Sequence, residues 1–354
     1  MSNWEIIQKR MSGELPPPGP PFDATPTTAI LVFEGLVLLG FLAAVFILPR
    51  FRPRLWRHAA VMAGAVLIFE IFTGPMWRNL HMGKWAYLYQ QTSWVLTLGW
   101  TALFLATDVF VDHLARARSA LSRFAIKLAA LTPVVLGFEI LLGAIGLRSY
   151  APEVWASVCG IKLAGVPVEV LYYVPVFAAL ILGFHGYWAL VLDGAAVAPR
   201  PRPRWARGFL LALLGVVLFE LMIEPMVTNA GLPKWAYYYH DLNLLLTLLW
   251  VVVLGLAVIT VEHFLIHWDL GHRFLAALAV LALVATPIEA AFIAKGIRIY
   301  GPSTCERFSG LTIPPSGVPM EVVFAIPLYF ALVLGFTRYL DLAASNPRQA
   351  TAKP

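Results

Sequence analysis

The chain has 354 residues, of which 60% are hydrophobic and only 13% are charged. A water-soluble protein of this length needs more polar surface to cover its core, so the composition excludes an ordinary soluble globular protein. The net charge of +6 is concentrated in a few loops, described below, which argues against a nucleic-acid-binding surface.

Hydrophobic runs long enough to cross a bilayer recur along the chain. A helix of about 20 mostly apolar residues spans a hydrocarbon core ~30 Å thick. The alternating pattern of a membrane β-barrel is absent, so the spans are predicted to be helices. The sequence therefore predicts an all-α integral membrane protein with nine spans. They are Ala29–Leu48, Ala59–Gly74, Trp94–Val111, Phe124–Ile145, Val166–Leu190, Gly208–Ile223, Leu244–Val261, Phe274–Ala294 and Val318–Tyr339.

The chain begins with a polar, proline-rich segment, residues 1–27. This segment has no basic region followed directly by a short apolar stretch and a small-residue cleavage site, so no signal peptide is predicted. Residues 28–49 are therefore expected to remain in the protein as a transmembrane helix.

Arginines gather in every second loop, after the first, third and fifth spans. They are Arg50, Arg52, Arg54, Arg57, Arg116, Arg118, Arg123, Arg200, Arg202, Arg204 and Arg207. Cytoplasmic loops carry such an excess of basic residues, which predicts an outside N-terminus and a cytoplasmic C-terminus. We expect a protein of the bacterial inner membrane whose partner is the lipid bilayer, with no nucleic acid.

An internal repeat relates residues 55–195 to residues 206–342. Most of the shared polar residues are 150 positions apart, and the separation becomes 152 after a two-residue insertion. The pairs include Glu70 and Glu220, Asn79 and Asn229, Lys84-Trp85-Ala86-Tyr87 and Lys234-Trp235-Ala236-Tyr237, Tyr89 and Tyr239, Glu139 and Glu289, Tyr150 and Tyr300, and Glu169 and Glu321.

Each copy contains four predicted spans, an even number, so both copies are expected to have the same orientation. A pseudo-two-fold axis along the membrane normal then relates them. The helix at residues 28–49 lies outside the repeat, residues 196–205 form a basic linker, and residues 343–354 form a cytoplasmic tail.

Six shared glutamates are predicted to lie at one depth, near the outer side of the membrane. They are Glu70, Glu139, Glu169, Glu220, Glu289 and Glu321. A charged side chain at the centre of a membrane helix costs at least ~2.5 kcal/mol, so such residues face a bundle interior or a cavity. These six are candidate catalytic acids and bases around a polar chamber. The alternative is helix capping, which suits Glu169 and Glu321 because each follows a proline at a helix start.

Aromatic and amide residues repeat beside this acid layer and are candidates for substrate binding. They are Asn79, Trp85, Tyr87, Tyr89, Tyr150, Asn229, Trp235, Tyr237, Tyr239 and Tyr300, together with Glu224, which only the second copy carries. Aromatic faces stabilise cations and hold apolar ligands. The alternative is the aromatic belt that membrane proteins place at the lipid–water interface.

No metal, nucleotide or phosphate-binding motif is found, so neither a cofactor nor a metal is expected. His263 and His267 share one helical face but lie far from the acids, and a structural role is expected for both. Cys159 and Cys305 fall in outward loops, where they either pair as a disulfide or remain as free thiols.

The second hairpin of each copy resembles the membrane-embedded, flavin-independent lycopene cyclase family. The resemblance rests on Gly146-Leu-Arg-Ser-Tyr150 before Gly165-Val-Pro-Val-Glu169, and on Gly296-Ile-Arg-Ile-Tyr300 before Gly317-Val-Pro-Met-Glu321. A second resemblance is to the spirocyclase of avermectin-type pathways. The lycopene cyclase family has a Glu-Glu pair whose second residue is Val170 or Val322 here. A Trp of its loop is Arg148 or Arg298 here.

The resemblance implies a duplicated helical cyclase that acts on a carotenoid or other terpenoid lipid without redox chemistry. The hypothesis is a cyclase or isomerase in which one carboxyl donates a proton and another removes one, with Asn79 and Asn229 orienting them. The alternative is a proton- or cation-coupled transporter or a lipid-binding protein; a scaffold subunit is a third possibility. The prolines shared by the two copies are expected near helix ends, unlike the broken helices of many transporters.

Overall fold

A computed structural model of the chain describes residues 1–157, 161–194, 205–314 and 316–345. Within these ranges, nine helices are long and apolar enough to cross a membrane, which confirms the predicted all-α membrane fold. The predicted linker at residues 196–205 and tail at residues 343–354 lie mostly outside the described ranges, and so does Cys159.

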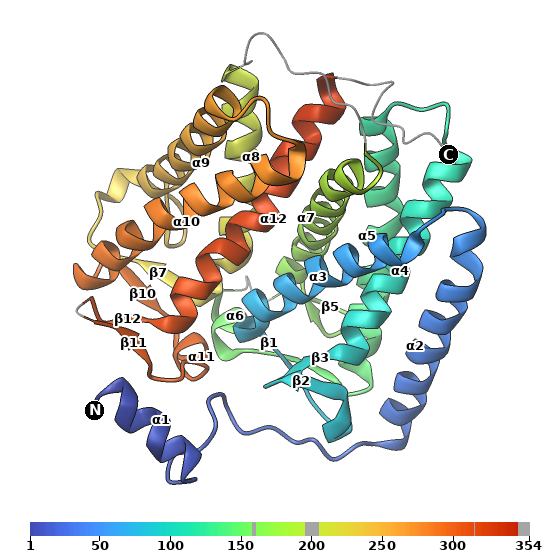
Figure 1. Cartoon of the computed structure of the whole chain (residues 1–354). Helices are drawn as coiled ribbons and strands as arrows, with labels where there is room; N and C mark the ends of the chain where they lie inside the picture. The colour runs from blue at the N-terminus through green and yellow to red at the C-terminus, as the bar shows by residue number, and fades with distance from the viewer. Residues whose placement is uncertain (158–160, 195–204, 315, 346–354) are drawn as a thin grey trace.

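The nine long helices comprise one N-terminal helix and two sets of four. They are α2 (Thr28–Ile47), α3 (Leu55–Thr73), α4 (Trp94–Leu114), α5 (Ala120–Ala144), α7 (Val168–Leu192), α8 (Trp205–Ile223), α9 (Leu244–Phe264), α10 (Leu270–Ala294) and α12 (Met320–Ser345). Helices α3, α4, α5 and α7 belong to the first copy, and α8, α9, α10 and α12 occupy the corresponding places in the second copy (Figure 1).

Short strands join the long helices at one end of the bundle, which we call the hairpin end. The paired strands are β1 (Trp77–Asn79) with β4 (Arg148–Tyr150), β2 (Tyr87–Tyr89) with β3 (Thr92–Ser93), β5 (Lys162–Leu163) with β6 (Val166–Pro167), β7 (Val227–Asn229) with β10 (Arg298–Tyr300), β8 (Tyr237–Tyr239) with β9 (Leu242–Asn243), and β11 (Thr312–Ile313) with β12 (Val318–Pro319). All six pairs are antiparallel. The opposite end carries Arg50, Arg54, Arg118 and Arg207, and we call it the arginine end.

Short helices complete the connections. They are α1 (Asn3–Met11), η1 (Leu48–Arg50), η2 (Gly74–Met76), η3 (Lys84–Ala86), α6 (Pro152–Ser157), η4 (Glu224–Met226), η5 (Lys234–Ala236) and α11 (Pro302–Cys305). Pro75 and Pro225 lie in the 3-10 turns that follow α3 and α8. Because proline cannot donate a backbone hydrogen bond, both α-helices end there.

Local sequence signals also set the helix starts. The side chains of Ser93 and Asn243 accept hydrogen bonds from the backbone N–H groups of Leu96 and Leu245, which caps α4 and α9. The expectation that shared prolines lie near helix ends holds for Pro75 and Pro225. It is wrong for Pro175 and Pro327, which lie inside α7 and α12. Membrane helices tolerate interior prolines because packed neighbours satisfy the freed backbone groups.

The two copies meet where α7 crosses α12. A Cβ atom added to Gly183 would lie 2.6 Å from the Cα atom of Phe336, and one added to Gly335 would lie 2.7 Å from the Cα atom of Phe184. These two reciprocal contacts show that the crossing is two-fold symmetric. They also show why glycine is required there, because no side chain fits between the two backbones.

The N-terminal segment passes across the hairpin end from the second copy to the first (Figure 1). Helix α1 is held on the second copy by Asn3, whose Nδ2 donates to the Thr312 carbonyl at 2.6 Å and whose Oδ1 accepts from the Thr312 N–H at 3.0 Å. The chain then reaches α2, which packs beside α4 of the first copy. Both copies are thus tied together at the end where the glutamates lie.

Candidate functional site

Each copy places one glutamate of its first helix against a threonine of its second helix. The Thr97 hydroxyl donates to Glu70 Oε2 at 2.5 Å, and the Thr247 hydroxyl donates to Glu220 Oε2 at 2.5 Å. These threonines are not among the site residues predicted from the sequence. They are also 150 residues apart, so the repeat contained the signal that would have found them.

The second glutamate of each copy pairs with an arginine of the neighbouring strand. Arg148 Nη2 lies 3.2 Å from Glu139 Oε1, and Arg298 Nε lies 3.0 Å from Glu289 Oε1. A tyrosine two residues after each arginine also donates to the same carboxylate, at 3.3 Å from Tyr150 to Glu139 and at 2.7 Å from Tyr300 to Glu289. These charge-assisted contacts fix the position of the carboxylate.

The shared asparagines reach the glutamates only through the arginines. Asn79 Oδ1 accepts from Arg148 Nη1 at 2.8 Å, and Asn229 Oδ1 accepts from Arg298 Nη1 at 2.6 Å. Strand pairing places Asn79 opposite Arg148 and Asn229 opposite Arg298. The two arginines were noted in the sequence only as departures from a family pattern, yet they link each asparagine to its acid.

A cavity of about 280 Å³ is lined mainly by residues of the second copy. Four carboxylates and two guanidinium groups line it together with aromatic and aliphatic side chains. The charged groups are Glu220, Glu224, Glu289, Glu321, Arg298 and Arg307. Tyr89, Asn229 and Tyr300 line the same cavity. Seven of the predicted site residues therefore meet at one place.

The corresponding space in the first copy is almost filled, with a cavity of about 40 Å³. Three large side chains of the first copy have smaller counterparts in the second. Trp77, Tyr173 and Val135 line the first cavity, and their counterparts Val227, Ala325 and Ala285 line the second. Glu70 and Glu139 line the filled site, so only the second copy offers its two acids to a sizeable ligand.

The large cavity lies between the two copies. Its lining includes Ile71, Phe72, Tyr89 and Gln90 of the first copy. Arg307 of the second copy donates to Gln90 Oε1 at 3.1 Å, so it joins the copies at the rim of the cavity. Burial, and secondarily the charge of Arg78, lower the pKa of Arg307 to about 10, which leaves it cationic at neutral pH.

A short chain of hydroxyl groups leads from the surface of the hairpin end to Glu220. Tyr238 is 44% exposed, and its hydroxyl lies 3.3 Å from the Thr247 hydroxyl, which in turn donates to Glu220. Burial of the rest of the ring raises the pKa of Tyr238, so its hydroxyl keeps its proton at neutral pH. The first copy has Leu88 at this position and therefore lacks the chain.

The remaining aromatic candidates lie outside both cavities. Trp85 is 50% exposed and Trp235 is 72% exposed, both at the hairpin end. Tyr87 and Tyr237 each donate a hydrogen bond to the backbone carbonyl of the shared asparagine of their copy, at 3.0 Å and 2.9 Å. The two tyrosines thus help to hold their loops in place. The Tyr239 ring packs at a tilt against the His240 ring.

The glutamates that open α7 and α12 differ in their surroundings. Glu321 lines the large cavity, and its Oε1 accepts from the Ser309 N–H at 2.7 Å. Glu169 lies in the first turn of α7 and lines neither of the two cavities. Only Glu321 therefore has a place beside a ligand in the large cavity.

Within the described ranges, no group of three or more His, Cys, Asp and Glu side chains is arranged to hold a metal ion. Cys305 is an exposed free thiol, while Cys159 lies outside the described residues. The His263 ring makes an edge-on contact with the Phe264 ring.

Comparison of the chain with family models, with curated proteins and with solved structures gives no match.

Proposed function

We propose that the protein is a membrane enzyme that cyclises or isomerises a lipophilic, isoprenoid-like or polyketide-like substrate by acid/base chemistry without redox. The observation that carries this proposal is the cavity of about 280 Å³, which joins four carboxylates to an extensive apolar wall. Small-molecule sites combine an apolar lining with a few placed polar groups in this way.

The two glutamates of the second copy suit different roles. Within the described part of the chain Glu220 has no ion-pair partner, and it is hydrogen-bonded to a neutral hydroxyl. Glu289 pairs with Arg298 and accepts from Tyr300. A carboxyl without a counter-cation is suited to donate a proton, and a carboxylate held by a guanidinium is suited to accept one.

The proposed reaction needs no other reactant. The Glu220 carboxyl donates its proton to one carbon of an alkene, and the electron pair of the double bond forms the new C–H bond. The neighbouring carbon becomes cationic. In an isomerisation it loses an adjacent proton to Glu289, whereas in a cyclisation a second double bond attacks it to close a ring and the new cation then loses a proton to Glu289. In both cases one proton enters from Glu220 and one leaves to Glu289. The rings of Trp250, Tyr329 and Phe330 line the cavity and face this cation. Tyr238 and Thr247 return a proton to Glu220 from the surface.

Substrate reaches the cavity from the bilayer in this proposal. Ile71 and Phe324 line the cavity and are 38% and 64% exposed, within the membrane-spanning helices α3 and α12. The cavity wall thus extends to the lipid-facing surface. From the arginine distribution we place the hairpin end outside and the arginine end in the cytoplasm of a bacterial inner membrane. The resemblance to the lycopene cyclase family supports a terpenoid or carotenoid substrate.

The proposal is tested by Glu220→Gln, with Glu70→Gln as the matched control in the first copy. Each change removes one acid and keeps its volume and its threonine partner. Lipid extracts of cells that express each variant are compared with those of cells that express the unchanged protein. A cyclised or isomerised lipid should disappear with Glu220→Gln and persist with Glu70→Gln. Full product with Glu220→Gln, or equal loss in both variants, contradicts the proposal.

A proton- or cation-coupled transporter, or a lipid-binding protein, is the second candidate. The chain of hydroxyls from Tyr238 to Glu220 also suits proton uptake by a transporter. Purified protein in sealed vesicles separates the two functions. Solute uptake driven by a pH gradient, with unchanged lipid composition, identifies a transporter.

A further inference from the structure

A second, larger cavity lies at the arginine end of the first copy, on the opposite side of the membrane from the proposed active site. Its volume is about 630 Å³. Six cationic side chains line this cavity, which we call the arginine basin. They are Arg52, Arg54, Arg57, Arg116, Arg123 and Lys127.

The carboxylates of the basin are already engaged by its inner cations. Asp108 lies 2.6 Å from Lys127 Nζ and 2.9 Å from Arg52 Nη1. Asp193 lies 2.9 Å from Arg52 Nη2, and Asp112 lies 2.8 Å from Lys127 Nζ. These three carboxylates therefore do not neutralise the positive charge at the rim of the basin.

The rim carries the remaining positive charge. Within the described ranges, Arg54 and Arg57 have no ion-pair partner, and Arg116 contacts only the ring of His113, at 2.7 Å. Guanidinium groups are matched to the oxygens of a phosphate, to which they donate paired hydrogen bonds.

Two buried histidines at the floor of the basin carry ring nitrogens without hydrogen-bond partners. His58 Nε2 lies 3.1 Å from Asp193 Oδ1, and His185 Nδ1 lies 3.8 Å from Asp108 Oδ2, beyond hydrogen-bond distance. His58 and His185 are both 1% exposed and line the basin. Neither ring nitrogen of His185 has a hydrogen-bond partner, and Nδ1 of His58 has none. A buried polar group without a hydrogen bond is unfavourable, so these nitrogens favour a bound polar ligand.

The second copy shows that the fold does not require this network. His58, Asp108, Lys127 and His185 correspond by the repeat to Gly208, Val258, Ala277 and Thr337. The basin chemistry is therefore specific to the first copy.

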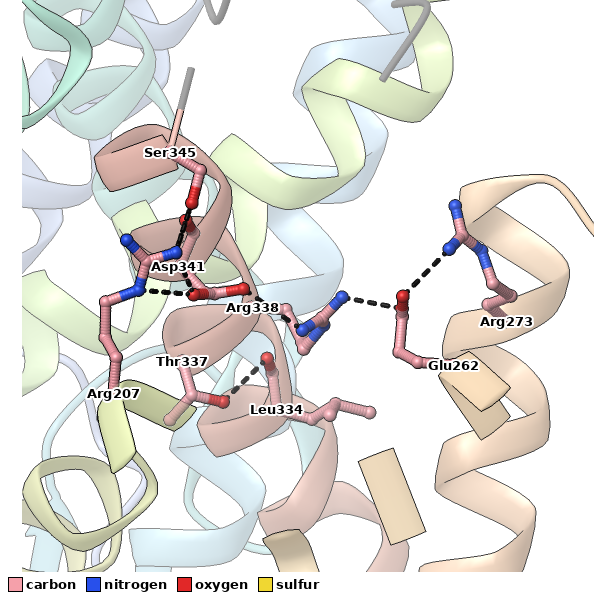
Figure 2. Close-up of polar contacts among 8 residues, drawn as sticks. All are labelled: Arg207, Glu262, Arg273, Leu334, Thr337, Arg338, Asp341 and Ser345. Carbon is pink, nitrogen blue, oxygen red and sulfur yellow. Dashed lines mark hydrogen bonds and ion pairs between the residues drawn. The ribbon is translucent and has the colours of Figure 1, made fainter. Parts of the chain in front are cut away.

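Among the described residues, three arginines at the same end of the second copy are paired with carboxylates (Figure 2). Arg338 lies 2.6 Å from Glu262, Arg273 lies 3.0 Å from the same carboxylate, and Arg207 lies 2.7 Å from Asp341. Thr337, the counterpart of His185, donates to a backbone carbonyl of its own helix at 3.1 Å. The first copy thus has its distinctive cavity at the arginine end, and the second copy has its distinctive cavity at the hairpin end.

We propose that the arginine basin binds a phosphate group, carried either by a soluble anion or by the headgroup of an anionic lipid. Arg54, Arg57 and Arg116 contact the phosphate oxygens, while the ion pairs of Arg52 and Lys127 shape the floor. This site is independent of the acid/base chemistry at the hairpin end.

The test compares two double variants that remove the same charge from the same end. Arg54→Ala with Arg57→Ala changes the rim of the basin. Arg50→Ala with Arg118→Ala changes two exposed arginines that do not line it. Detergent-purified protein is titrated with inorganic phosphate by calorimetry, and retention of phosphatidylglycerol is measured by native mass spectrometry.

The rim variant should bind about tenfold more weakly, a change of ~1.4 kcal/mol, while the control pair binds as the unchanged protein does. Binding of inorganic phosphate identifies a soluble anion as the source, and retention of phosphatidylglycerol alone identifies a lipid headgroup. Equal weakening in both variants would show general surface attraction and overturn the proposal, as would no binding of either probe. Thermal unfolding checks that both variants are folded.

Discussion

Replacing a small residue of the large cavity with the residue that fills the small cavity should abolish the proposed activity. Ala325 lines the large cavity, and its counterpart Tyr173 lines the small one, where the volume is about 40 Å³ instead of about 280 Å³. Ala325→Tyr introduces a phenol ring into space that a ligand would occupy. If the ring displaces ligand atoms equivalent to about four buried methylene groups, the binding free energy of the ligand falls by ~3 kcal/mol. This loss corresponds to a factor of about 100 in affinity.

The assay for Ala325→Tyr measures the product in lipid extracts and the lipophilic ligand that copurifies with the protein, by mass spectrometry. Leu283→Tyr is the control, because it adds the same side chain on α10 at a residue that is 76% exposed and lines no part of the cavity. Both variants should unfold near the temperature of the unchanged protein, since neither ring enters a filled core. Undiminished product and ligand with Ala325→Tyr would refute the assignment of the cavity.

Two further predictions concern the copy interface and the hydroxyl chain. Gly183→Ala places a Cβ atom 2.6 Å from the Cα atom of Phe336, well inside the ~3.5–4.0 Å of ordinary carbon contact, so it should destabilise the protein by ~1–3 kcal/mol in thermal unfolding. Gly137→Ala, which meets nothing within 4 Å, should not, and equal unfolding temperatures would argue against the close crossing. Tyr238→Phe should slow repeated turnover by about tenfold or more, because it breaks the chain to Glu220, whereas Leu88→Phe in the first copy should leave the rate unchanged. An unchanged rate in Tyr238→Phe would mean that protons reach Glu220 by another route.

The sequence predicts the fold because its signals are local and strong. Hydrophobic length identifies nine spans, and polar identities at one separation identify the duplication without knowledge of any contact. The six shared glutamates do not all meet: Glu220, Glu289 and Glu321 line the large cavity, Glu70 and Glu139 line the small one, and Glu169 lines neither.

Which copy holds the cavity could not be predicted. The difference depends on Trp77, Tyr173 and Val135, which come from a strand and two helices and meet only in the folded protein. Arg148 shows the same limit, because its link to Asn79 depends on the pairing of β1 with β4.

The basin was missed for a different reason. The general excess of positive charge in cytoplasmic loops already accounts for its arginines, so the sequence offered no reason to assign them a binding role. His58 and His185 are far apart in the chain, yet their rings lie 5.5 Å apart in the structure. Comparison of the two copies could have indicated them, because neither histidine has a histidine counterpart in the second copy.

The central claim is that the cavity of the second copy holds the lipophilic substrate beside Glu220 and Glu289. An experimental density map of the Glu220→Gln variant, purified from the cells that make the substrate, tests it most directly. The account predicts elongated density in the cavity between α3, α8 and α12, in contact with both carboxyl positions, and none at Glu70. An empty second cavity, or equal density in both copies, would contradict it.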